Sequence, residues 1–267
     1  MPKLHRGYAD TSLGQLHYCE SGSGPAVLLL HQTPRSMDEF ADVIPLLAED
    51  FRVIAMDMVG FGLSPGVDGD HSIELMADGA LALMDELSVP RFAVLGHHTG
   101  GAVAIEIAAR QPERISHLCL SSAPWTDARF RLDHADGPGV DEAELAEDGS
   151  HLTLLWSMRA PFYPEGRPDI LTRFIRDAIA PGVDPVEGHR ACARYIMEDR
   201  IGLITAPTLV IGAASDPFAL PEIPRLRSGL VNAASVREVV IPDGHIPLME
   251  EHPDEVVAAV RGFLLDT

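Results

Sequence analysis

The strongest structural signal in the sequence is the stretch FAVLGHHTGG at residues 92–101. Its first half is an apolar run typical of a buried strand, and the alanine-rich pattern that starts at Gly100 is typical of a helix. Glycine at positions 96 and 100 permits a very tight turn, because the strand and helix backbones nearly touch there and leave no room for Cβ atoms. We therefore expect His98, midway between the two glycines, to project from the carboxyl-terminal edge of a sheet.

Strand-like and helix-like segments alternate on both sides of this turn, after an expected opening hairpin of residues 6–10 and 15–20. The pattern predicts an α/β fold, with a mostly parallel central sheet wrapped by helices. The expected strands are residues 26–30, 52–57, 92–96, 115–121, 207–212 and 236–241, and the expected helices are residues 37–47, 73–87, 100–110 and 253–265.

Residues 125–200 follow a different pattern. Acidic, helix-like stretches are separated there by breaks rich in glycine and proline, and no strand-like run appears. We therefore expect a core made of residues 1–124 and 201–267, with residues 125–200 as a helical insertion.

The composition excludes several classes of partner. Lys and Arg number 20 against 40 Asp and Glu, so the formal net charge of −20 disfavours nucleic acid and anionic membrane surfaces. With 46% hydrophobic and 22% charged residues, the chain is typical of a globular protein. Its start lacks the apolar region of a signal peptide, so we expect a cytoplasmic protein. A homodimer is compatible with the sequence. The three cysteines have no CxxC spacing and are expected to be unpaired thiols.

Four further segments carry polar residues at the ends of expected strands. They are HQTP at residues 31–34, DMVGFGLS at 57–64, GAASDP at 212–217 and DGH at 243–245. Together with the Gly-x-X-x-Gly turn, these segments resemble, in type and in chain order, the motifs of the α/β-hydrolase fold family. The resemblance covers essentially the whole chain and implies the same fold, with residues 125–200 as a helical cap over the pocket.

The resemblance also implies a set of site residues. His98 falls at the position of the nucleophile, Asp216 at that of the catalytic acid and His245 at that of the catalytic histidine. The backbone N–H groups of Thr33 and Thr99 fall at the positions of an oxyanion hole. In this family arrangement Asp216 would orient His245.

Position 98 departs from the family, which usually has Ser, Asp or Cys there. Histidine is enriched among residues with positive φ, so the turn geometry is expected to survive. Three roles are open for His98: a nucleophile that forms an acyl-imidazole, a general acid or base, or a metal ligand together with Asp216 and His245. Because Asp216 would lie behind His245, we expect neither a metal nor another cofactor.

The alternatives to a catalytic role are structural. His98 could fill an inert site in a protein that binds a ligand without turnover. His97 is interpreted as a packed histidine that supports the turn, and Asp57 and Ser64 as turn formers. Gln32 replaces the usual glycine of its loop, so its amide could face the pocket.

Within the expected cap, the large side chains of Trp125, Trp156, Phe162 and Tyr163 are candidates for the lining of the pocket. Aromatic residues on such helices are also common in simple cores. Three arginines could hold a substrate carboxylate, although exposed arginine is the more usual situation: Arg129, Arg131 and Arg159.

These observations predict an enzyme that hydrolyses a small ester, lactone or related carbonyl compound through an atypical His98–Asp216–His245 triad. The first alternative is a non-hydrolytic lyase or isomerase that uses the two histidines as acid and base. The second is a ligand-binding protein without turnover. A haloalkane or epoxide mechanism that depends on an aspartate at the elbow is disfavoured, because position 98 carries no carboxylate.

Overall fold

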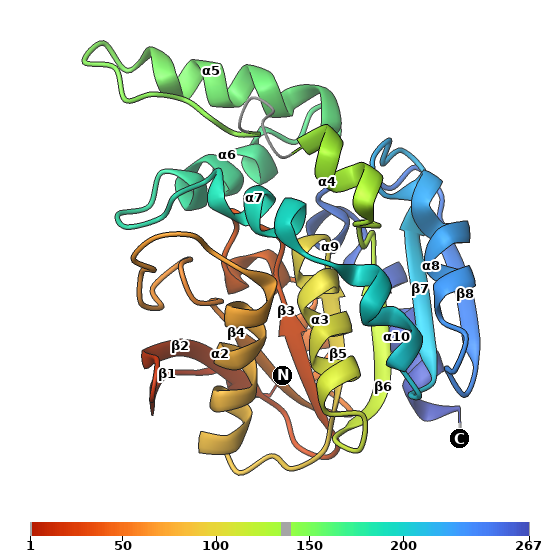
Figure 1. The fold of residues 1–267 in the computed structure, drawn as a ribbon. Coiled ribbons are helices and arrows are strands. Elements are labelled where there is room, and N and C mark those ends of the chain that lie inside the picture. The colour runs from red at the N-terminus through yellow and green to blue at the C-terminus, as the bar shows by residue number, and fades with distance from the viewer. Residues whose placement is uncertain (1, 135–139, 267) are drawn as a thin grey trace.

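The computed structural model describes residues 2–134 and 140–266, and its centre is one eight-stranded sheet in the order β1-β2-β4-β3-β5-β6-β7-β8 (Figure 1). The first pairs, β1 with β2 and β2 with β4, are antiparallel, and the five remaining pairs are parallel. The predicted α/β fold with a mostly parallel sheet is therefore confirmed. The strands are β1 (His5–Thr11), β2 (Gly14–Ser21), β3 (Ala26–Leu30), β4 (Arg52–Met56), β5 (Phe92–His97), β6 (Ile115–Ser121), β7 (Thr208–Ala213) and β8 (Val236–Ile241).

Helices cover both faces of this sheet, as the apolar residues of β3 show. Leu28 and Leu30 belong to the apolar cluster that includes α2 (Ile73–Glu86) and α3 (Thr99–Arg110). Their neighbour Leu29 belongs to a second cluster on the opposite face. Successive side chains of a strand point to opposite faces, so an unbroken apolar run is what a strand buried on both sides requires. The second cluster also contains residues of α1 (Ile44–Leu47), α9 (Leu248–Glu251) and α10 (Pro253–Leu265).

The helix predicted for residues 37–47 is not continuous. It forms a 3-10 turn, η1 (Met37–Phe40), and then the short helix α1. The reason is Pro45, which has no N–H to donate to the carbonyl group of residue 41. The break leaves η1 free to turn beside the loop that carries residues 31–34.

Residues 125–200, called the cap segment below, contain no strand among their described residues. Figure 1 shows α5, α6 and α7 beyond the carboxyl-terminal ends of the strands. The division of the chain into two domains stays a prediction. The helices of the segment are α4 (Ala128–His134), α5 (Ser150–Arg159), α6 (Pro168–Ala178) and α7 (Glu187–Arg194), with the 3-10 turns η2 (Ala160–Phe162) and η3 (Met197–Asp199). After it come η4 (Ile201–Leu203), η5 (Leu220–Glu222) and α8 (Ile223–Gly229).

A buried ion cluster fixes α6 to the core. The guanidinium group of Arg35 is fully buried and contacts Asp177 of α6 at 2.9 Å and Glu250 of α9 at 2.7 Å. Arg173 of α6 contacts Asp38 of η1 at 2.8 Å. Because a buried charge is costly without its partners, these contacts hold the cap segment in one place on the core.

No helix in the described part of the chain is long and apolar enough to cross a membrane. The three cysteines are buried and unpaired, as expected.

Candidate active site

The site is organised by the turn between β5 and α3. His98 has φ 46° and ψ −115°, a strained conformation for a residue other than glycine. Its N–H donates to the carbonyl of Ser121 at 2.9 Å, which anchors the turn to β6. A Cβ at Gly96 would collide with the carbonyl of Gly100, and one at Gly100 with the carbonyl of Leu30. The close approach that the sequence predicts is therefore present, and His98 stands at the carboxyl end of β5.

Asp216 contacts His98 directly. Asp216 Oδ2 lies 3.0 Å from His98 Nε2, and neither atom has another partner among the described residues. Asp216 Oδ1 accepts hydrogen bonds from the backbone N–H groups of Phe218 and Ala219. Burial would raise the pKa of Asp216, but the adjacent His98 and the two N–H donors lower it to about 2. The carboxylate is therefore ionised near neutral pH.

This contact differs from the expected triad, in which Asp216 orients His245. His245 is instead held by Glu251, which accepts from its Nδ1 at 2.9 Å and from its backbone N–H at 2.7 Å. Glu251 lies six residues further on, at the end of α9, so the loop and the helix after it supply the two groups. The structure thus contains two separate histidine–carboxylate pairs where the sequence predicts one chain of three residues.

The two pairs present different ring nitrogens to the site. A lone pair on His98 Nε2 would repel the Asp216 carboxylate at 3.0 Å, so the proton belongs on Nε2 and the lone pair on Nδ1. By the same argument His245 carries its proton on Nδ1 and its lone pair on Nε2. Neither His98 Nδ1 nor His245 Nε2 forms a hydrogen bond in the described part of the chain, so each ring keeps an unused acceptor.

His97 packs behind the turn, as interpreted from the sequence. Its ring makes an edge-to-face contact with His98, with centroids 4.7 Å apart. Its Nε2 donates to the carbonyl of Ile246 at 2.9 Å, and its Nδ1 lies 3.1 Å from the hydroxyl of Ser121. Burial lowers the pKa of His97 to about 3, so the ring is neutral and supports both His98 and the loop that carries His245.

Thr33 and Thr99, the predicted oxyanion-hole residues, lie side by side. Their hydroxyl groups are 2.9 Å apart. The backbone N–H groups of both residues form no hydrogen bond among the described residues, and that of Thr99 is the first of α3. Two unused donors beside His98 are what an oxyanion hole requires.

The helix α7 covers these two threonines. Gly188 packs so closely against Thr33 that a Cβ there would overlap its hydroxyl group. One helical turn later, the Cys192 thiol lies 3.8 Å from the Thr99 hydroxyl. The cap segment therefore lies directly over the proposed oxyanion hole.

The side-chain N–H of Gln32 binds a neighbouring acid within the protein. Its amide donates to Glu39 Oε1 at 2.5 Å, and its backbone N–H donates to Glu39 Oε2 at 2.8 Å. Both residues are buried. Burial raises the pKa of Glu39 to about 7, against the opposing effect of Arg35. These bonds fix the backbone of the loop, and a role of Gln32 in binding substrate stays a prediction. The sequence could not show the contact, because Glu39 lies in a different element.

Asp57, Ser64 and His31 have structural roles. Asp57 accepts from the backbone N–H groups of Met37 and Leu63, and Ser64 Oγ donates to the Asp57 carbonyl at 2.6 Å. His31 Nδ1 donates to the carbonyl of residue 32, and its Nε2 accepts from the N–H of residue 58. The turn-former interpretation of Asp57 and Ser64 agrees with these bonds.

Of the four cap aromatics, Phe162 contacts the loop that carries Asp216, and Tyr163 packs within the apolar cluster of the cap segment. Phe162 makes an edge-to-face contact with Phe218, which follows Asp216, with centroids 5.0 Å apart. Tyr163 is 6% exposed and its hydroxyl group has no partner among the described residues. By contrast, Trp125 donates to Asp127 and packs at the edge of the core, and Trp156 is 36% exposed.

The cap also contributes a histidine that the sequence analysis missed. His189 Nε2 lies 3.1 Å from Asp141, which also binds Arg159 as an ion pair. Arg159 is only 8% exposed, although arginine side chains are usually exposed, and its ion-pair partner is Asp141 of the same chain. Arg131 is likewise paired, with Glu198, whereas Arg129 has an exposed partner in Asp133. No motif marks His189; only its place on α7, next to Gly188, brings it near the site.

No group of three or more histidine, cysteine or acidic side chains is arranged to hold a metal ion within residues 2–134 and 140–266.

Comparison with known proteins places this architecture in a class. A family model described as the alpha/beta hydrolase fold matches residues 25–252. The chain is 26% identical over 270 residues to haloalkane dehalogenase 2 of Mycobacterium tuberculosis, covering 94% of this chain and 92% of the relative. It is 34% identical over 167 residues to bifunctional epoxide hydrolase 2 of Mus musculus, covering 55% of this chain but only 30% of that protein. Among solved structures, the enol-lactonase of Burkholderia xenovorans LB400 has a TM-score of 0.79 at 21% identity, covering 96% and 99% of the two chains.

These matches, with the mostly parallel sheet and its nucleophile-elbow turn, define a protein of the hydrolase class. The chain belongs to the alpha/beta hydrolase fold family. The prediction of a hydrolase enzyme is thereby confirmed.

Proposed function

We propose that the protein hydrolyses a small ester, lactone or related carbonyl compound with His98 as a general base. One observation carries the proposal: the ionised Asp216 lies 3.0 Å from Nε2 of His98, which places the lone pair of the ring on Nδ1. The backbone N–H of Thr99, the next residue, and that of Thr33 have no partner among the described residues. A base and an oxyanion hole are the two parts that attack of water on a carbonyl group needs.

The reaction then proceeds in two steps. His98 Nδ1 takes a proton from water as the water oxygen bonds to the carbonyl carbon, and the N–H groups of Thr33 and Thr99 stabilise the resulting oxyanion. Asp216 stabilises the imidazolium that forms. The tetrahedral intermediate collapses, the bond to the leaving oxygen breaks, and that oxygen receives the proton from His98. His245, held by Glu251, is a second residue that can exchange a proton with the substrate.

The observed contacts favour a base over a nucleophile. In the nucleophile mechanism expected from the sequence, His245 oriented by Asp216 would activate His98, but Asp216 contacts His98 itself. The names of the relatives suggest halide or epoxide substrates. An ester intermediate on the elbow residue requires a carboxylate there, and His98 provides none.

The substrate contacts proposed in the cap are Phe162 and Tyr163. Phe162 reaches the loop that carries Asp216 and offers an apolar face. The unpartnered hydroxyl group of Tyr163 offers one hydrogen bond in a buried setting, where a polar group gains from finding a partner. A small, partly apolar substrate with one further polar group fits this pair.

The test is a rate measurement on p-nitrophenyl esters and small lactones. We expect His98→Ala to lower kcat/KM by about 10²–10⁴-fold, the range of a general base. His5→Ala, an exposed histidine on β1, is the matched control and should retain wild-type activity. If wild type and His98→Ala have equal rates on every substrate turned over, the proposal is wrong.

The non-hydrolytic alternative is favoured by the same pair, because Asp216 and His98 could equally remove a proton from carbon next to a carbonyl group. Incubation of candidate ketones in D₂O separates the two reactions. Deuterium uptake that requires His98, in a protein without esterase or lactonase activity, would replace hydrolysis with the lyase or isomerase reaction.

A further inference from the structure

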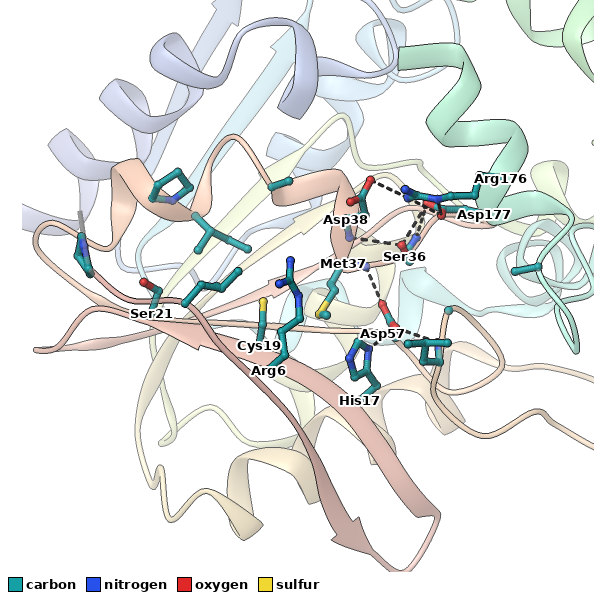
Figure 2. Close-up of a pocket in the computed structure, with 18 residues that line it drawn as sticks. Arg6, His17, Cys19, Ser21, Ser36, Met37, Asp38, Asp57, Arg176 and Asp177 are labelled. Carbon is teal, nitrogen blue, oxygen red and sulfur yellow. Dashed lines mark hydrogen bonds and ion pairs between the residues drawn. The ribbon is translucent and has the colours of Figure 1, made fainter. Parts of the chain in front are cut away.

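A cavity lies apart from the candidate active site. It has a volume of about 470 Å³, within the range of sites for small molecules. None of His98, Asp216 and His245 lines it. Its walls come from β1 and β2, from η1 and from the end of α6, so it lies where the cap segment meets the core (Figure 2).

Most of the wall is apolar. The apolar side chains include Leu4, Met37, Ile44, Pro45 and Leu63. They would contact a hydrocarbon portion of a bound molecule, and burial of such a portion is favourable in proportion to its area.

The carboxylates of the wall are already paired. Asp57 accepts from His17 Nδ1 at 2.8 Å and from two backbone N–H groups. Asp38 binds the guanidinium groups of two α6 arginines, and Asp177 binds Arg35 and Arg176. None of the three offers an uncompensated negative charge to a ligand.

One cation of the wall is not paired. Arg6 forms no hydrogen bond and no ion pair with any described residue, and Figure 2 shows its side chain extending from β1 toward the segment of Met37 and Asp38. The other arginine of the wall, Arg176, is bound to both Asp38 and Asp177. The free charge of this cavity is therefore positive, although the whole chain is strongly acidic.

The side chain of His17 adds a ring nitrogen to the wall near Arg6. His17 is 7% exposed, its Nδ1 is held by Asp57, and its Nε2 has no hydrogen-bond partner among the described residues. A ring nitrogen so placed can face a carboxylate oxygen when protonated or a hydroxyl group when neutral. Arg6 and His17 sit on neighbouring strands and line the same cavity.

We propose that this cavity binds a small carboxylate with an apolar tail, the carboxylate at Arg6 and His17 and the tail against Met37, Ile44 and Leu63. A planar guanidinium group is well suited to a carboxylate, with two parallel hydrogen bonds. A ligand in this position touches α6 of the cap segment and η1 of the core at once, and it is separate from the substrate of the proposed reaction.

The probe is octanoate, with 1-octanol as the neutral molecule of equal chain length. Both are titrated into protein labelled with ¹³C on the methionine methyl groups, and the Met37 signal is assigned from Met37→Leu. We expect saturable octanoate binding at Met37, with octanol at least about tenfold weaker.

The variants locate the site. Arg6→Gln should weaken octanoate binding about tenfold. Arg91→Gln should leave the affinity unchanged, because Arg91 is an exposed arginine just before β5, with no ion pair in the described structure. His98→Ala should also leave it unchanged. Equal affinity for octanol and octanoate, no effect of Arg6→Gln, a loss with His98→Ala, or no saturable shift of Met37 would each overturn the proposal.

Discussion

The two histidine–carboxylate pairs at the carboxyl end of the sheet are built differently. His98 belongs to a turn locked between β5 and α3, and its acid arrives from a distant segment, the loop after β7. His245 comes from the loop after β8 and its acid Glu251 from the helix α9 that follows, and Glu251 binds both the ring and the backbone of His245.

The comparison shows two different roles for a carboxylate that contacts a histidine. At His98 the acid holds Nε2 of a residue whose backbone is already fixed by packing, so its main effect is on the proton and charge of the ring. At His245 the acid also fixes the backbone, so it positions the loop as much as the ring. We therefore expect catalysis to be more sensitive to loss of the carboxylate charge at the His98 pair. At the His245 pair we expect it to be more sensitive to loss of the hydrogen bonds that position the loop.

Asp216→Asn is expected to have the largest effect. The amide keeps the size of the side chain but removes the charge that stabilises protonated His98, so kcat/KM should fall by about 10³–10⁴-fold. Rates on the best ester or lactone substrate measure this. A loss of less than tenfold would show that the contact between the two residues is not used in the reaction.

The stability of the protein in acid should distinguish the pairs next. The folded-state pKa of Asp216 is about 2, against 3.8 for the free side chain, so its contribution is complete above about pH 4 and is lost as the pH falls toward 2. This contribution is about 2 kcal/mol of unfolding free energy. Urea unfolding at pH 5 and pH 2.5 should show a steeper loss for wild type than for Asp216→Asn. Parallel losses would contradict the assignment of this carboxylate as ionised and paired.

Glu251→Gln should be milder. Glutamine has one acceptor oxygen in place of two, so it keeps one of the two bonds to His245, and we expect kcat/KM to fall by only about tenfold. Glu251→Ala, which removes both bonds, is the companion variant and should cost more than the glutamine. Equal and large losses in Glu251→Gln and Asp216→Asn would mean that the two carboxylates do the same job.

Phe218→Ala should have the smallest effect. The side chain contacts Phe162 of the cap, whereas the bond to Asp216 is made by the backbone and survives the change. An aromatic pair contributes about 0.5–1.5 kcal/mol, so KM should rise by up to about tenfold with kcat within about twofold. A fall in kcat instead would show that the phenyl ring positions Asp216.

Much of the fold could be predicted from the sequence because its strands are buried on both faces. The continuous apolar runs of β3 and β5 and the paired glycines at 96 and 100 leave few alternatives. The helix at residues 37–47 was predicted wrongly as continuous, because helical spacing of apolar residues outweighed one proline. The separation of core and cap into domains stays a prediction.

The sequence allowed the places of the candidate site residues to be predicted, but not which carboxylate pairs with which histidine. Motifs placed His98, Asp216 and His245 at the ends of strands, where the structure has them. Which carboxylate contacts which imidazole ring depends on the paths of two loops. A shift of a few ångströms in either loop would exchange the partners. Glu251 and Glu39 belong to no motif, and their roles follow from the hydrogen bonds that they accept in the folded structure.

The buried Arg35 restricts which cap segments can be combined with the core of this enzyme. Its guanidinium group is paired with Asp177 of the cap segment and with Glu250 and Asp38 of the core, so a chimera with a foreign cap would remove one of its carboxylate partners. Breaking a buried ion pair costs about 3–5 kcal/mol, a large share of the stability of an ordinary protein. Recombination of caps among relatives should therefore succeed only where the donor helix carries its own acid at the position of Asp177.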